Sequence, residues 1–128
     1  MERMKPTEFK SYLETRTRVF SVAVLKALDV LPKKNSSKVI ANQLGRSATS
    51  IGANYHEANR AESGDDFRHK LSIALKEANE TRYWIQLLAD TGYLVPSNAT
   101  AVSLVEDCVE LIRLLTASIR TAKQKKSY

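Results

Sequence analysis

The sequence predicts an all-α protein, an antiparallel up-down-up-down four-helix bundle in a single domain of residues 1–128. Apolar residues recur at steps of three and four through four long segments, which is the spacing of one helix face. Four glycines and three prolines are few for 128 residues, which favours long helices over many short strands. The segments are joined by short connections, so consecutive helices should be antiparallel neighbours.

The first helix should cover about residues 7–31. Pro6 suits its start, because the N–H that proline lacks would be unpaired there. The apolar seam consists of Phe9, Leu13, Phe20, Ala23 or Val24, Ala27 and Leu31. Val19, Val22, Leu25 and Val30 widen this seam in the second half, so we expect the rest of the bundle or another subunit to cover that half.

The second helix should cover about residues 37–62, capped by Ser36 or Ser37 through a side-chain oxygen that accepts from a free backbone N–H. Its seam consists of Ile40, Leu44, Ser47, Ile51, Asn54, Ala58 and Ala61. A neighbouring stripe is small: Ala41, Gly45, Ala48 and Gly52. Because a helical glycine costs about 1 kcal/mol relative to alanine, close approach of another helix explains this stripe better than tolerated surface glycines do.

The third helix should cover about residues 64–91 and the fourth about residues 98–123. Ser63 caps the third helix, with Asp66 where a capping-box glutamate would stand, and Thr91-Gly92 ends it. The third seam consists of Phe67, Leu71, Ala74, Ala78, Thr81, Ile85 and Leu88. The fourth helix begins at Ser97 or Asn98, and its seam consists of Ala101, Leu104, Cys108, Leu111, Leu115 and Ile119 or Ala122.

Two features indicate a soluble protein of the cytoplasm. The single cysteine, Cys108, cannot form an internal disulfide, which fits a reducing compartment. The first residues are no signal peptide, and the most apolar run, residues 19–31, contains Lys26 and Asp29 and is too short to span a bilayer. We therefore expect no membrane partner.

The chain offers no catalytic or metal-binding pattern. Di-metal sites in four-helix bundles use Glu-x-x-His pairs, but Glu77 is followed at the third position by Glu80. His56 and His69 lie on different helices and have no partner one turn away. Cys108 falls on an apolar seam, where cysteine is usually a small buried hydrophobe. We predict no enzyme activity, no metal and no cofactor.

Polar residues line the central pair of helices. With the turn near Gly64, residues whose numbers sum to about 128 should lie at the same height, which predicts the ion pairs Arg46–Glu80 and Glu57–Lys70. Ser47, Ser50 and Asn54 would then satisfy a buried carboxylate. We interpret the set Arg46, Ser50, Asn54, Glu57 and Glu80 as a structural layer that fixes register and assembly; the alternative is a polar ligand pocket.

The net charge of +6 is unevenly distributed. Residues 1–38 carry +5, residues 39–112 carry −4 and residues 113–128 carry +5. In an up-down bundle, one end collects basic residues from three places, namely Arg3, Lys5 and Lys10, then Arg60, Arg68 and Lys70, then Arg120, Lys123, Lys125 and Lys126. Such a cluster favours nucleic-acid phosphates with little sequence preference. The alternative is a set of solvated charges.

Several stretches carry a family resemblance: SIGANYHEA at 50–58, Ser63, DF at 66–67, IALKEA at 73–78 and ETRYW at 80–84. They resemble the bacterial four-helix-bundle proteins encoded by intervening sequences in large-subunit ribosomal RNA genes. The resemblance covers most of the chain and is strongest over residues 39–95. The matching positions are Arg46, Ser50, Asn54, Glu57, Phe67 and Glu80. This chain departs from the family in having Ala58 for a common glycine, and Glu77-Ala78 where Gly-Ser is frequent.

The resemblance implies a bundle that assembles into a ring, usually a pentamer, with no established reaction. The related accessory protein of diversity-generating retroelements works with a reverse transcriptase and nucleic acid through a basic surface. We therefore expect a non-catalytic, oligomeric accessory protein that binds RNA or DNA through the basic bundle end. One alternative is an oligomeric scaffold that binds only protein partners. Another is an enzyme whose site forms between subunits.

Overall fold

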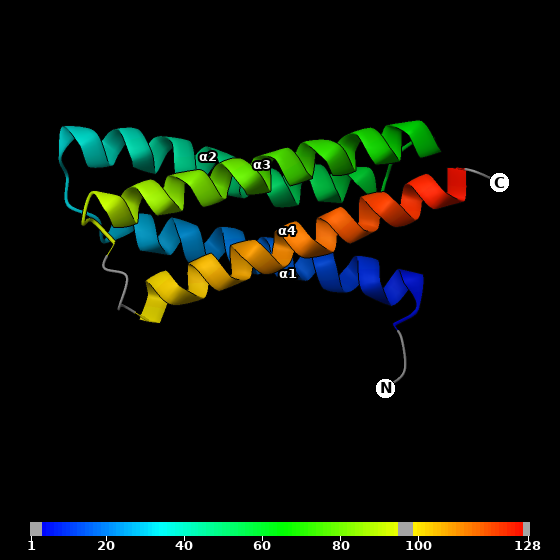
Figure 1. Cartoon of the computed structure of the whole chain (residues 1–128), viewed down its shortest axis with the longest axis horizontal. Helices are drawn as coiled ribbons and strands as arrows, with labels where there is room; N and C mark the ends of the chain where they lie inside the picture. Colours follow the sequence, from blue (N-terminus) through cyan, green and yellow to red (C-terminus); the bar gives the residue numbers. More distant parts are fainter. Residues whose placement is uncertain (1–3, 95–98, 127–128) are drawn as a thin grey trace.

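A computed structural model describes residues 4–94 and 99–126, with Ala99 and Lys126 described for their backbone alone. It contains four α-helices, α1 (Pro6–Asp29), α2 (Asn35–Ala58), α3 (Gly64–Asp90) and α4 (Ala99–Lys126), which run up and down in turn (Figure 1). These two stretches contain no strand. The predicted fold class, an all-α four-helix bundle, is confirmed. None of the helices, as far as they are described, is both long and apolar enough to cross a membrane.

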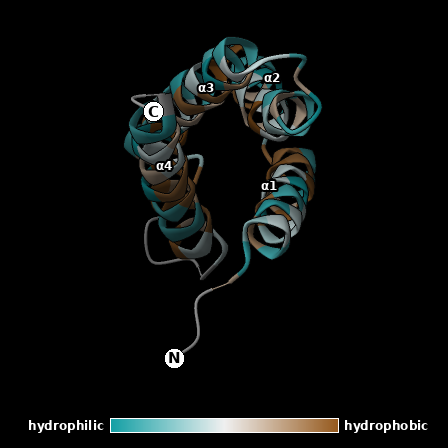
Figure 2. Ribbon diagram, turned by 90° about the vertical axis from the view of Figure 1, so that its right-hand side faces the viewer, coloured by the Kyte–Doolittle hydropathy of each residue, from teal (hydrophilic) through white to brown (hydrophobic). Residues whose placement is uncertain are grey.

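The helices follow one another around the bundle in chain order, as the end-on view shows (Figure 2). The contact between α2 and α3 is the most extensive, and that between α1 and α4 is the smallest. Most residues of the predicted seams face inward and form one core. Its larger buried members are Leu13, Phe20, Val24, Ile40, Leu44, Ile51, Tyr55, Leu71, Ile85, Leu88, Leu104, Leu111 and Leu115. On α2, however, the structure buries Tyr55, which was not predicted, and leaves the predicted Asn54 only partly buried.

Some helix ends differ from the expected positions. Ser37 does not cap α2 but lies in its first turn, where its Oγ accepts from the backbone N–H of Lys34 at 2.9 Å. The helix ends at Ala58, four residues before the predicted residue 62, and Asn59 is its C-cap. In contrast, α4 is longer than predicted and continues to Lys126, beyond the predicted end at residue 123. The predicted start at Ser97 or Asn98 lies outside the described residues.

Both ends of α3 have the predicted caps. Ser63 Oγ accepts from the backbone N–H of Asp66 at 3.1 Å. After the helix, Gly92 adopts a φ of +81°, and the N–H groups of Gly92 and Tyr93 donate to the carbonyls of Ala89 and Leu88. This is a Schellman motif, in which glycine takes the left-handed conformation that other residues avoid. Thr91-Gly92 therefore stops the helix as its sequence predicts.

The small stripe of α2 packs against α1. Ala48 is fully buried, and a Cβ added at Gly52 would lie 3.2 Å from Thr17 Oγ1 and 3.5 Å from the Thr17 carbonyl carbon. The predicted close approach of another helix is confirmed at this point. In contrast, the second apolar face of α1, formed by Val19, Val22, Leu25 and Val30, is exposed on the single chain.

Candidate nucleic-acid interface

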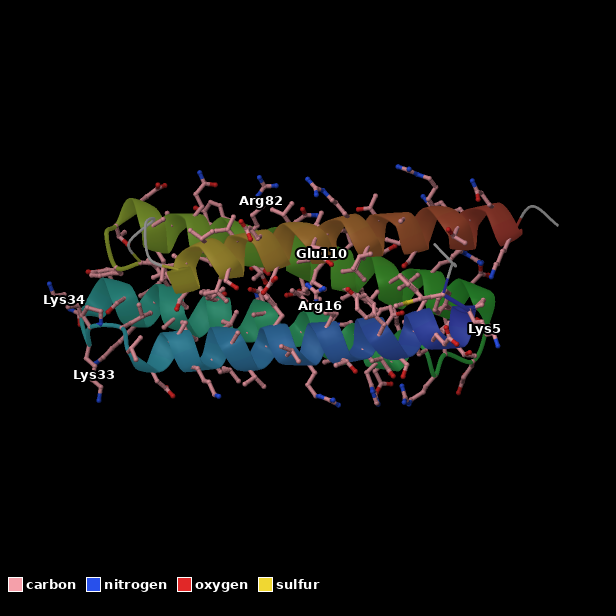
Figure 3. All side chains as sticks on the ribbon, turned by 90° about the horizontal axis from the view of Figure 1, so that it is seen from below. Lys5, Arg16, Lys33, Lys34, Arg82 and Glu110 are labelled. Atoms are coloured by element: carbon pink, nitrogen blue, oxygen red, sulfur yellow. The ribbon has the colours of Figure 1, made fainter. Side chains whose placement is uncertain are left out.

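Three separate parts of the chain meet at one end of the bundle. The start of α1, the α2–α3 turn and the end of α4 lie together in Figure 1. Lys5 marks this end, whereas Lys33 and Lys34 lie at the opposite end (Figure 3). We call the end with Lys5 the basic end. It brings together the elements that carry the predicted nucleic-acid-binding residues.

The hairpin cations at the basic end are offset by nearby carboxylates. Arg60 Nη1 donates to Glu14 Oε1 at 2.6 Å, and Arg68 pairs with Asp65. Lys70 Nζ lies 3.3 Å from Asp66 Oδ2, one turn earlier on the same helix. The predicted Glu57–Lys70 pair is therefore not formed, because the local carboxylate takes its place.

The cations near the chain ends have a different environment. Lys10 Nζ lies 5.1 Å above the centroid of the Phe67 ring, a cation–π contact that leaves its charge uncompensated. On α4, Arg120, Lys123 and Lys125 are exposed, and none of the ion pairs found among residues 4–94 and 99–126 involves them. Arg3 and the side chain of Lys126 lie outside the described part. At the basic end, the described cations that lack an ion pair therefore lie on α4 and the start of α1.

The predicted Arg46–Glu80 ion pair is present between α2 and α3. Arg46 Nη2 lies 2.6 Å from Glu80 Oε2, and Arg46 Nη1 lies 3.1 Å from Glu77 Oε2, a second partner that the sequence did not indicate. Hydrogen bonding to Arg46 lowers the pKa of Glu80, and the nearby Trp84 indole lowers it further. One guanidinium therefore joins two carboxylates on the facing helix.

The neighbouring polar side chains do not satisfy a carboxylate, contrary to expectation. Ser50 Oγ donates to the carbonyl of Arg46 at 2.7 Å, and Asn54 Nδ2 donates to the carbonyl of Ser50 at 2.8 Å. Both bonds stay within α2, since a side chain at position i reaches the carbonyl one turn back. The buried polar contact between the two helices is instead Thr81 Oγ1 to Ser47 Oγ at 2.9 Å. Of the five residues predicted to form a structural layer, only Arg46 and Glu80 join α2 to α3.

A second charged contact, which sequence reasoning missed, joins α1 to α4. Arg16 Nη1 donates to Glu110 Oε1 at 2.8 Å and to the Tyr12 hydroxyl at 2.7 Å, while its Nη2 lies 3.6 Å from Asp107 Oδ1. Arg16 and Glu110 face each other midway along the bundle (Figure 3). Hydrogen bonding to Arg16 lowers the pKa of Glu110. These residues meet only because of how far α1 and α4 are shifted relative to each other along the bundle axis. All three connections together determine that shift.

A cavity of about 450 Å³ with a mixed polar and apolar lining lies between α1 and α2. Besides the Arg60 bond, Glu14 Oε1 lies 3.3 Å from His56 Nδ1. The Arg60 hydrogen bond is the main reason that the pKa of Glu14 is lowered, so this carboxylate is ionised at neutral pH. Arg18 also lines the cavity. Sequence reasoning placed Arg60 at the basic end but missed this cluster.

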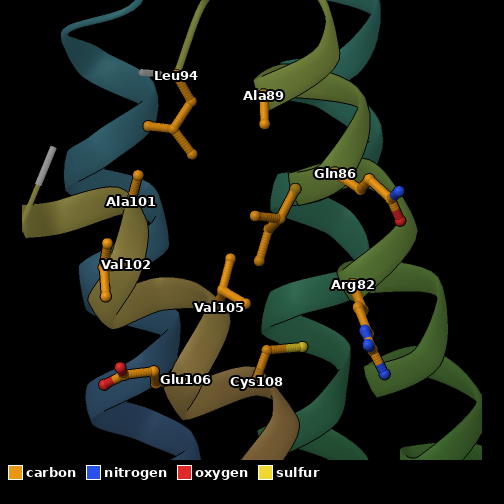
Figure 4. A pocket seen from close by; sticks show the side chains of 10 residues that line it. Arg82, Gln86, Ala89, Leu94, Ala101, Val102, Val105, Glu106 and Cys108 are labelled. Atoms are coloured by element: carbon orange, nitrogen blue, oxygen red, sulfur yellow. The ribbon is translucent and has the colours of Figure 1, made fainter. Parts of the chain in front are cut away.

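A larger cavity, about 510 Å³, lies between α3 and α4 and has mainly apolar walls. Leu94, Ala101, Val105 and Cys108 border it, while Gln86 and Glu106 point away from it (Figure 4). Burial raises the pKa of the Cys108 thiol to about 12, so this cysteine is a protonated apolar side chain as predicted. The cavity lacks the converging polar groups that orient a ligand.

The two histidines lie on different helices. His69 is exposed, and His56 makes the Glu14 contact described above. Within the described stretches, no three His, Cys, Asp or Glu side chains lie close enough together to hold a metal ion.

Comparison with known proteins places this bundle in a family. The model of the 23S rRNA-intervening sequence protein family matches residues 10–117. A similar solved structure is that of a protein of unknown function from the S23 ribosomal protein family of Bacteroides thetaiotaomicron, with a TM-score of 0.79 and 38% identity over 88% of this chain and 98% of that one. None of the curated proteins matches. The chain belongs to the family of 23S rRNA-intervening sequence proteins.

Proposed function

We propose that this protein is a non-catalytic accessory protein that assembles into an oligomer and binds RNA or DNA phosphates through its basic end. The observation that carries the proposal is the uncompensated charge of Arg120, Lys123 and Lys125 on the last turns of α4, at the same end of the bundle as the start of α1. Contacts of this kind bind by releasing counterions from the phosphate backbone and need little sequence recognition. Lys10, which makes no described ion pair, adds to this charge, whereas Arg60, Arg68 and Lys70 add less to the net charge because carboxylates lie against them.

Assembly would multiply this charge. The exposed apolar face of α1, with Val19, Val22, Leu25 and Val30, is the kind of surface that marks protein contacts. A ring, a pentamer by family resemblance, would present five basic ends to one nucleic acid. Repeated weak contacts then add up to tight binding through effective concentration. We place this activity in the bacterial cytoplasm, where the unpaired Cys108 stays reduced.

The test is binding of purified protein to structured RNA and to duplex DNA across a salt series, with the molar mass measured in the same buffers. Lys123→Glu/Lys125→Glu should weaken binding to all sequences and reduce the steepness of the salt dependence. Each lost phosphate contact lowers the log–log slope by about 0.7–0.9. The matched control is Lys33→Glu/Lys34→Glu, which makes the same charge change on exposed residues at the opposite end.

Equal losses in the two variants would refute a role of the basic end, since net charge alone would then explain binding. Absence of binding by the wild type at low salt would favour the alternative, a scaffold with protein partners only. In that case the exposed face of α1 becomes the surface to study.

A further inference from the structure

We infer that the cavity between α1 and α2 seats one backbone phosphate of the bound nucleic acid, held by Arg18 and Arg60. This inference rests on the proposed function and extends the contact surface from the basic end along the groove between these two helices. Sequence reasoning gave no role to Arg18 and treated Arg60 as one of many charges at the end of the bundle.

The cavity has the size and lining of a ligand site. Its volume of about 450 Å³ falls in the range of roughly 300–1,000 Å³ that is common for small ligands. Polar and charged side chains from both helices line it, including Glu14, Arg18, Ser21, Thr49, His56 and Arg60. Apolar side chains such as Val22 and Ala53 also line the cavity, so its lining is mixed, and the two arginines are the groups that suit it to an anion.

One edge of the Arg60 guanidinium, with the N–H groups of Nε and Nη2, is available for a ligand. Both hydrogen bonds described for its guanidinium, to Glu14 Oε1 and to the carbonyl of His56, leave from Nη1. The N–H groups of Nε and Nη2 make no bond to any described residue, and the side chain is 53% exposed. A paired set of N–H groups on one edge of a guanidinium matches two oxygens of a phosphate. Glu14 thus positions Arg60 through Nη1 and leaves the Nε and Nη2 edge free to bind a phosphate.

The charge balance of the cavity also favours an anion. Arg18 is exposed and takes part in none of the described ion pairs or hydrogen bonds, so its charge is uncompensated. With one ionised carboxylate, Glu14, against Arg18 and Arg60, the cavity carries a net charge of about +1. Thr17, Ser21 and Thr49 give their hydroxyl protons to backbone carbonyls, so the arginines are the permanently charged donors in the cavity.

A substitution at Glu14 tests the inference, because loss of its negative charge should strengthen phosphate binding, whereas loss of a structural role should weaken it. Glu14→Gln keeps a side-chain oxygen for Arg60 and removes the negative charge beside the phosphate. Nucleic-acid affinity at low salt should rise about threefold, as expected for one unit charge a few ångströms away in a water-exposed site. If Glu14 merely maintained the structure of the binding surface, the same substitution would weaken binding.

The experiment measures affinity and salt slope for the same RNA and DNA with Arg18→Gln, Glu14→Gln and a control, Lys76→Gln, which removes one exposed charge on α3. We expect Arg18→Gln to weaken binding about three- to tenfold at low salt and to lower the slope by about 0.7–0.9, more than the control does. Urea unfolding of each variant separates binding effects from stability.

The outcomes distinguish the two proposals. If the Lys123→Glu/Lys125→Glu variant loses affinity while Arg18→Gln behaves like Lys76→Gln, the basic end binds nucleic acid and the cavity does not. A Glu14→Gln variant that binds more weakly than the wild type also overturns the cavity assignment. A wild-type protein that binds neither RNA nor DNA overturns both.

Discussion

The two glycines within α2 should respond in opposite directions to the same substitution. Alanine is favoured over glycine in a helix by about 1 kcal/mol, and overpacking costs about 1–3 kcal/mol. At Gly45 the new methyl group would lie 3.2 Å from Leu28 Cδ1, the end of a flexible side chain that can turn away. We expect Gly45→Ala to range from neutral to about 1 kcal/mol more stable.

At Gly52 the neighbour is stiff. The new methyl group would lie 3.2 Å from Oγ1, 3.3 Å from Cβ and 3.5 Å from the carbonyl carbon of Thr17. Thr17 is β-branched, and its Oγ1 donates to the carbonyl of Glu14 at 2.9 Å, so no rotamer change relieves the contact. The helices must separate, and we expect Gly52→Ala to be destabilised by about 1 kcal/mol after its gain in helix propensity.

The assay is urea unfolding followed by far-UV circular dichroism, at two protein concentrations because assembly makes stability depend on concentration. The two variants should differ by about 1–2 kcal/mol, with equal slopes against urea. Should Gly52→Ala be as stable as Gly45→Ala, α1 would not approach α2 at Thr17 as closely as the structure has it. The small stripe would then need another explanation.

Two further results follow from ionisable groups. Arg16 lowers the pKa of Glu110, so the stability from this pair is fully present above the ordinary glutamate value of 4.5 and is lost as the pH falls through the lower folded value. The melting temperature of Glu110→Gln should therefore fall less below pH 5 than that of the wild type, and the substitution should lower the free energy of unfolding at pH 7 by about 0.2–1 kcal/mol. A melting temperature that falls with acid as steeply as in the wild type would contradict this. Because burial raises the pKa of Cys108 from 9.0 to about 12, its alkylation at pH 8 should be at least about a hundredfold slower in the folded protein than in urea, and equal rates would place the thiol at the surface.

Much of the fold could be predicted because each helix carries a periodic pattern that needs no partner to be recognised. The Arg46–Glu80 pair could be predicted too, since one short turn fixes the register of α2 and α3. The same arithmetic was wrong for Lys70, because it ignored Asp66, the i,i+4 partner on the same helix with which Lys70 pairs.

The other contacts could not be predicted, because they join residues far apart in the sequence whose relative positions are not set by a single short turn. Arg16 and Glu110 are 94 residues apart, and three connections determine whether they face each other. Arg60 illustrates a different limit. Its position at the basic end was predictable, but its bond to Glu14 depends on where α2 ends, and the sequence placed that end at residue 62 instead of Ala58.

Glu77 and Ala78 are neighbours on α3 with different environments. Ala78 is fully buried in the core, and Glu77 accepts a hydrogen bond from Arg46 at 3.1 Å. Glu77 therefore gives the Arg46–Glu80 pair a second carboxylate between α2 and α3.

The unequal contacts between helices have a consequence for how the chain reaches its native state. The α2–α3 pair has the most extensive packing, and its turn is short, so its contacts form with little loop entropy. We expect this hairpin to be structured in the folding transition state, with α1 and α4 docking afterwards on either side. Native-state hydrogen exchange should then show α1 opening at lower free energy than the hairpin, because its second apolar face lacks a partner on the single chain. Assembly that covers this face would convert the least protected helix into one of the most protected.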